Sequence, residues 1–283
     1  MRHGKRMLWM TLAAGAIAGG FIFFDLRWAE PLVINAGLCA LVKPGDTAVT
    51  DVPRKFKFRA SDVGDAQVVT ALFSALSGKS RNRDVDGEWV IGGQIDMSAA
   101  NALRQRLAQA SAPTRLRISS GGGDERAAID MADQIASHGL PVIVDAFCGS
   151  SCANYLLPAS PRVQVEGIVL MHGSSASCAT QLGVWEGVRQ MGWRGFWTLH
   201  FAAQRHDAFE QRHPHFKALV ARSAPPDRGD PSGTPHVWRY VSPAELVAAH
   251  PALTVGAREA QSLAAYRALQ RQAPGLLSDI YLP

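Results

Sequence analysis

Between Gly87 and Leu157 short apolar runs alternate with amphipathic segments, and this alternation limits the possible folds more than any other feature of the sequence. It predicts strands at 88–91, 114–118 and 141–144, and helices at 99–110, 124–138 and 151–157. Several of the short connections are rich in glycine, and Gly139 is placed to end the second helix. Strands and helices that alternate in this way are typical of βαβ units with a mostly parallel sheet. The sequence therefore predicts an α/β domain.

The composition excludes several classes of protein. Hydrophobic residues make up 47% and charged residues 19% of the chain, which excludes disordered, collagen-like and polytopic membrane proteins. The net charge of +5 comes from 29 basic and 24 acidic residues, and three of the basic residues lie among the first six. Because no later block of lysine and arginine stands out, we expect no nucleic-acid partner. Four cysteines are too few for a disulfide scaffold.

The N-terminus combines a basic flank with an uncharged apolar run at residues 8–24. A transmembrane helix needs ~17–25 residues, whereas a signal-peptide core has ~7–15 and ends at a small-x-small cleavage site. Arg27 occupies a position of the nearest candidate site where a small residue is required. We therefore expect a single-pass anchor in the inner membrane, with the basic end in the cytoplasm and the main domain in the periplasm or another extracytoplasmic space. A cleaved signal peptide is the alternative, and it places the domain in the same compartment.

The remaining chain is predicted to form one domain. Residues 1–25 are the cytoplasmic flank and anchor, residues 26–60 a tether with a lead-in strand at 55–59, and residues 61–283 the α/β domain. The segment 184–222 is predicted to be largely helical, and its aromatic part at 185–216 is the candidate surface for a homo-oligomer.

Three short motifs carry groups that can do chemistry. They are the glycine turn Ser120–Gly123, the corner Cys148–Cys152, and His172 after the apolar run 168–170. Glycines between a strand and a helix can turn backbone N–H groups toward an anion. A serine in the first turn of a helix has a neighbouring N–H free to stabilise an oxyanion. Considered alone, the serine is most simply interpreted as a helix cap and the histidine as a structural residue.

In this order and spacing the motifs resemble the Clp-protease/crotonase superfamily, in particular its serine peptidase branch. Residues 118–123 match the family's glycine turn, with Gly121 in place of proline. Residues 151–160 match the nucleophile helix without a gap, with Ser160 in place of the closing glycine, and residues 169–172 match the strand that ends in the base histidine.

The resemblance covers about residues 87–255 and implies a spiral of ββα units preceded by the anchor. It also implies a peptidase that cleaves peptide or protein substrates without a cofactor or metal. The implied nucleophile is Ser151, with Ser150 as the alternative, and the implied base is His172. Backbone N–H groups of Gly122, Gly123 and Cys152 would form the oxyanion hole. The family's aspartate has no clear counterpart, and Asp230 in the loop before the segment 238–245 is the candidate.

Two other functions remain open. Without a clear aspartate, the domain can be a catalytically inactive crotonase-like module for binding or scaffolding. Acyl-CoA chemistry is a third possibility, which export disfavours because CoA esters are cytoplasmic.

The cysteines and the other histidines can also be interpreted from the sequence. If the motifs converge, Cys178 is a partner for Cys148 or Cys152 in an oxidising compartment, and buried free thiols are the alternative. The histidines of the long helical region are expected at the surface or in an interface, and not as metal ligands. They are His200, His206, His213 and His215.

Overall fold

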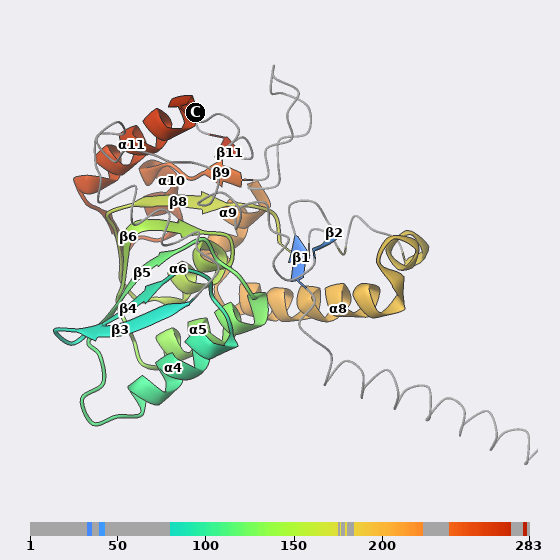
Figure 1. Ribbon diagram of the computed structural model, residues 1–283, viewed down its shortest axis with the longest axis horizontal. Helices are drawn as coiled ribbons and strands as arrows, with labels where there is room; N and C mark the ends of the chain where they lie inside the picture. The colour runs from blue at the N-terminus through green and yellow to red at the C-terminus, as the bar shows by residue number, and fades with distance from the viewer. Residues whose placement is uncertain are drawn as a thin grey trace, which may run out of the picture.

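The computed structural model describes residues 33–35, 40–42, 80–174, 176, 179, 184–222, 238–272 and 280–281 (Figure 1). The anchor at 8–24, the lead-in strand at 55–59, Cys178 and Asp230 lie outside these residues. Within the described part, no helix combines the length and apolar character that crossing a bilayer requires.

A mixed sheet of nine described strands forms the centre of the molecule. Seven of them lie in the order β11-β9-β8-β6-β5-β4-β3, and β7 joins β6 to β10. The strands are β3 (Arg81–Val85), β4 (Glu88–Gly92), β5 (Arg115–Ser120), β6 (Val142–Gly149), β7 (Val163–Val165), β8 (Ile168–Met171), β9 (Trp238–Tyr240), β10 (Leu253–Val255) and β11 (Ile280–Tyr281). Only the β3–β4 and β8–β9 pairs of this sheet are antiparallel among the described strands. The predicted α/β class and mostly parallel sheet are confirmed.

Helices lie against this sheet or extend beyond it. They are α4 (Met97–Leu107), α5 (Glu125–Ser137), the π-helical turn η2 (Cys152–Leu156), α6 (Leu157–Ala159), α8 (Val184–Arg212), the 3₁₀ turn η3 (Pro214–Phe216), α9 (Lys217–Arg222), α10 (Pro243–Ala249) and α11 (Arg258–Gln272). A separate antiparallel pair, β1 (Val33–Asn35) and β2 (Ala40–Val42), precedes them. The strands predicted at 88–91, 114–118 and 141–144 and the helices predicted at 99–110 and 124–138 are confirmed, with small shifts of their ends.

Local sequence explains where α4 and α5 begin and which faces they bury. The Asp96 carboxylate caps α4 by accepting from Ala99 N at 2.8 Å, and Asp124 caps α5 by accepting from Ala127 N at 2.9 Å. The buried faces include Leu103 and Leu107 on α4 and Ala128, Ala132 and Ile135 on α5. The two helices therefore cover the core with apolar side chains at helical spacing.

Strand β6 organises the site because it pairs with different neighbours along its length. β5 pairs with it along one edge, while on the other edge its first half pairs with β7 and Phe147–Gly149 pair with Ile168–Leu170 of β8. Gly167 permits the turn between β7 and β8, since a Cβ there would lie 2.2 Å from the Ala146 backbone. The carboxyl ends of β5, β6 and β8 therefore meet at one corner of the sheet.

Helix α8 has two parts that differ in exposure. Its backbone departs from helical geometry at Gly192 (φ 70°, ψ 171°). The C-terminal part buries Phe209, while Trp185 and Trp193 near the other end are 79% and 55% exposed. Figure 1 shows this gold end of α8 reaching away from the sheet. The predicted helical character of 184–222 is confirmed.

Candidate active site

The corner between β6 and η2 presents Ser150. This residue has φ +53°, in the left-handed region that non-glycine residues rarely adopt. Such a conformation costs about 1–3 kcal/mol and is concentrated at functional sites. Two backbone hydrogen bonds hold it, from Ser150 N to Leu170 O (3.1 Å) and from Asn154 N to Ser150 O (2.8 Å). The result is a sharp strand-to-helix turn with a half-buried serine at its apex.

Ser150 is hydrogen-bonded to His172, the first residue after β8. The distance from Ser150 Oγ to His172 Nε2 is 2.6 Å, and His172 Nδ1 lies 2.6 Å from the carbonyl oxygen of Gly173. Both contacts fit a single tautomer, in which Nδ1–H donates to the carbonyl and Nε2 accepts the hydroxyl proton. The imidazole is therefore oriented as a base toward Ser150.

The surroundings of His172 favour its neutral form and fix its position. Burial lowers the pKa of His172, and the hydrogen bond to Gly173 opposes this shift to a smaller extent. The edge-to-face contact with Trp238 has a ring-centroid distance of 4.8 Å. Asn154 Nδ2 donates to His172 O at 3.3 Å, which ties the histidine to η2. At neutral pH the side chain is therefore able to accept a proton.

Ser151 lies on the other side of the corner. This residue is 4% exposed, and its hydroxyl donates to Gly123 O at 3.2 Å. The expectation that Ser151 pairs with His172 is wrong: the structure brings the alternative, Ser150, to the histidine. The physical reason is the positive φ of Ser150, which turns this side chain out of the corner while the helix draws Ser151 inward.

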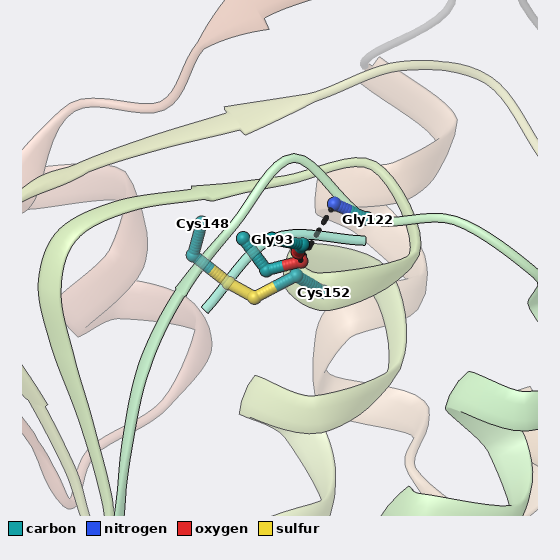
Figure 2. Close-up of a disulfide and its surroundings, with 5 residues drawn as sticks. Gly93, Gly122, Cys148 and Cys152 are labelled. Carbon is teal, nitrogen blue, oxygen red and sulfur yellow. Dashed lines mark hydrogen bonds between the residues drawn. A yellow bond between two sulfur atoms is a disulfide. The ribbon is translucent and has the colours of Figure 1, made fainter. Parts of the chain in front are cut away.

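The glycine turn packs directly against this corner. A Cβ on Gly122 would lie 2.6 Å from Ser150 Cβ and 2.9 Å from Ser151 N, so only glycine fits. Gly122 N donates to Ser120 Oγ at 3.0 Å, and Ser120 Oγ donates to Gly93 O at 2.6 Å (Figure 2). The N–H of Gly122 is thus already engaged inside the protein, unlike its expected role as an oxyanion donor.

Gly123 retains a free donor within the described part of the chain. Its neighbours make the loop contacts, from Ile95 N to Gly122 O and from Asp124 N to Ile95 O, both 2.8 Å. For the Gly123 N–H no acceptor is found among the described residues. The N–H that follows Ser150 belongs to Ser151, in the first turn of a helix where N–H groups lack helical acceptors. Cys152, expected as a donor, lies one residue further along.

A disulfide encloses the corner. Cys148 and Cys152 are bonded to each other, with their Cα atoms 5.4 Å apart (Figure 2). The expected pairing of either residue with Cys178 is therefore wrong, and so is the alternative of free thiols at these two positions. The sequence signal was present as two cysteines four residues apart on either side of a strand-to-helix turn. Such a turn brings their Cα atoms within disulfide range, which a continuous strand would not.

A second buried polar group lies beneath η2. Tyr155 Oη contacts His206 Nδ1 at 2.8 Å, and His206 Nε2 contacts Glu210 Oε1 at 3.1 Å. His206 is only 2% exposed and contacts Tyr155 of the same chain, so the expectation that it lies at the surface or in an interface is wrong. Burial lowers its pKa, while Glu210 and Asp207 act in the opposite direction. The sequence could not reveal this contact because it requires α8 to cover η2.

The candidate third member, Asp230, lies outside the described residues. In the described part the partner of His172 Nδ1 is the Gly173 carbonyl. The described residues also contain no group of three or more His, Cys, Asp or Glu side chains arranged to hold a metal ion.

Comparison with known proteins adds no assignment: the chain matches no family model and no curated protein. The chemical interpretation therefore depends on the site itself.

Proposed function

We propose that this protein is a serine hydrolase in which Ser150 is the nucleophile and His172 the general base. The observation that carries the proposal is the 2.6 Å contact between Ser150 Oγ and His172 Nε2, made by a serine at φ +53°. A buried neutral imidazole within hydrogen-bond distance of a serine hydroxyl can activate it as a nucleophile, and a strained strand-to-helix turn is a known way to present such a serine.

The reaction follows from these positions. Ser150 Oγ attacks a carbonyl carbon while its proton passes to His172 Nε2, and the N–H groups of Gly123 and Ser151 stabilise the oxyanion. His172 then gives this proton to the leaving amine, and water releases the acyl group by the same steps. The Gly173 carbonyl orients the imidazole on its other side.

Peptides are the proposed substrate class, because the three motifs resemble the serine peptidase branch of the Clp-protease/crotonase superfamily. On the edge of β6 away from β5, the first half pairs in parallel with β7 and the end pairs in parallel with β8. This arrangement agrees with a crotonase-like spiral and supports this part of the proposal. The anchor at 8–24, the extracytoplasmic location and a homo-oligomer remain predictions from the sequence.

A non-catalytic binding module is the second candidate. It is favoured by one observation, namely that the described partner of His172 Nδ1 is a backbone carbonyl and not a carboxylate. A carbonyl can orient the imidazole but offers less stabilisation to the imidazolium that forms during the reaction.

The deciding experiment labels the full-length chain in detergent with a fluorophosphonate, which reacts covalently with activated serines. We expect labelling of the wild type, none of Ser150→Ala, and strongly reduced labelling of His172→Ala. Ser151→Ala is the matched control, since it removes the same hydroxyl one residue away. It should retain labelling within ~10-fold, the scale of a single hydrogen bond to Gly123.

Other outcomes have clear meanings. Labelling that is lost only in Ser151→Ala would refute Ser150 as the nucleophile. An unlabelled wild type with native circular dichroism would refute the hydrolase and support the binding module.

A further inference from the structure

We propose that the Cys148–Cys152 disulfide positions Ser150 for reaction, so that the site is reactive only when this bond is formed. The inference rests on the proposed function because it concerns the same serine. It assigns a role to two residues that take no part in proton transfer or oxyanion binding.

The bond closes a ring around the reactive residue. Cys148 lies in β6, where it pairs with Ser120 of β5 and Val169 of β8, and Cys152 is the first residue of η2. Ser150 is the middle residue of the ring. Both cysteines are fully buried, so the two ends of the ring are held by the packed core.

The ring acts on a residue that would otherwise relax. Ser150 has a left-handed backbone conformation, which an L-residue leaves when nothing constrains it. Two backbone hydrogen bonds oppose this relaxation, to Leu170 O and from Asn154 N. Without the covalent link, the corner can turn Ser150 to negative φ and move its Oγ away from His172 Nε2.

The ring also controls the proposed oxyanion donors. Gly122 is in close contact with the Cβ of Ser150 and with the backbone of Gly149 and Ser151, as the lack of space for a Cβ shows. Ser120, which pairs with Cys148 across β5 and β6, links Gly122 to Gly93 by two hydrogen bonds next to the disulfide (Figure 2). A corner that relaxes therefore displaces the Ser151 N–H relative to the Gly123 N–H as well as the nucleophile.

This arrangement keeps the reactivity of the site low during the predicted export. Thiols remain reduced in a cytoplasm and are oxidised in extracytoplasmic compartments. Formation of the bond removes two electrons and two protons from Cys148 and Cys152, which a disulfide oxidant accepts while it is reduced to two thiols. The newly made chain thus reacts much more slowly until it reaches an oxidising compartment.

The test uses the full-length Cys39→Ala/Cys178→Ala variant, in which Cys148 and Cys152 are the only cysteines left. The chain is refolded with tris(carboxyethyl)phosphine, its free thiols are counted by alkylation and mass, and its fluorophosphonate labelling rate is measured. Glutathione disulfide is then added to form the bond. We expect the reduced protein to react ~10²-fold more slowly, the effect of a displacement of about 1 Å, and oxidation to restore the rate.

Adding Cys148→Ala and Cys152→Ala to the same background gives a second measurement, with the oxidised Cys39→Ala/Cys178→Ala variant as its matched control. A second readout is the ¹⁵N NMR signal of the His172 imidazole, which reports loss of the Ser150 contact independently of labelling. If the bond were merely structural, its loss would lower the unfolding temperature without changing either readout in the folded protein.

The outcomes separate the two proposals. Equal labelling rates and equal imidazole signals in folded reduced and oxidised protein would overturn the role of the disulfide. An oxidised protein that does not label at all would instead refute the hydrolase, while the imidazole signal would still report whether the bond positions Ser150. If the alanine variant fails to fold, the reversible reduction alone decides.

Discussion

At the scale of residues, a shift of one position decides which serine meets the histidine. Ser150 and Ser151 have the same side chain, yet one is half-buried beside His172 and the other is 4% exposed against Gly123. The difference comes from a single backbone angle at Ser150. An alignment of the helical residues from Ser151 onward cannot resolve it, because Ser150 precedes the helix and has a non-helical backbone conformation.

The pH dependence of labelling belongs to this scale. Reaction requires neutral His172, and burial lowers its pKa below the ordinary 6.5. We expect the labelling rate to rise with pH through an apparent pKa below 6.5 and to stay level from there to pH 8. Between the lowered pKa of His172 in the folded protein and its ordinary value of 6.5, the unfolded state binds more protons than the folded state. The free energy of unfolding therefore also rises with pH in that range.

The measurement is the labelling rate between pH 4.5 and 8, with His172→Ala as a control that shows no such inflection. An inflection above 6.5 would contradict the prediction. It would indicate a carboxylate close to the imidazole, as the role proposed for Asp230 requires.

At the scale of elements, Ser120 joins the glycine turn to the end of β4. Its hydroxyl accepts from Gly122 N and donates to Gly93 O, and it is fully buried. The neighbouring Ser119 hydroxyl is also buried but has no hydrogen-bond partner in the described structure. The two serines thus differ in their contacts and not in their chemistry.

We expect Ser120→Ala to lower the free energy of unfolding by about 1–3 kcal/mol, because it leaves a buried N–H and a buried carbonyl without partners. Labelling should fall as well, since the turn holds the Gly123 N–H. Ser119→Ala is the control and should be neutral or slightly stabilising. Urea unfolding of both variants checks this, and equal losses in the two would contradict the assigned role of Ser120.

At the scale of the whole molecule, the parallel order of β5, β6 and β8 assembles the site. The glycine turn, Ser150 and His172 each follow one of these strands, and the strands are neighbours in the sheet. Carboxyl ends of parallel strands meet at one edge, which is where α/β proteins commonly bind ligands. Residues that are far apart in the chain are therefore brought within hydrogen-bond distance by the topology.

The sequence also predicts how the whole chain is held in the cell. Full-length protein expressed in a bacterium should remain in the membrane fraction after carbonate extraction, with an intact N-terminus, because residues 8–24 are long enough to span the bilayer. Replacing Ala16 with arginine, as a charge at the centre of the run, should release much of the protein. Wild-type protein in the soluble periplasmic fraction with a shortened N-terminus would show that the segment is a cleaved signal peptide.

The sequence by itself determined the α/β class, the main strands and helices from 88 to 144, and the three motifs of the candidate site. These are local properties, set by hydrophobic period, by caps such as Asp124 and by glycine at tight turns. The tertiary structure decided that Ser150 faces His172, that Cys148 bonds to Cys152, and that His206 is buried against Tyr155. Each of these depends on a backbone angle or on contacts between distant segments, and neither is specified by the pattern of neighbouring residues.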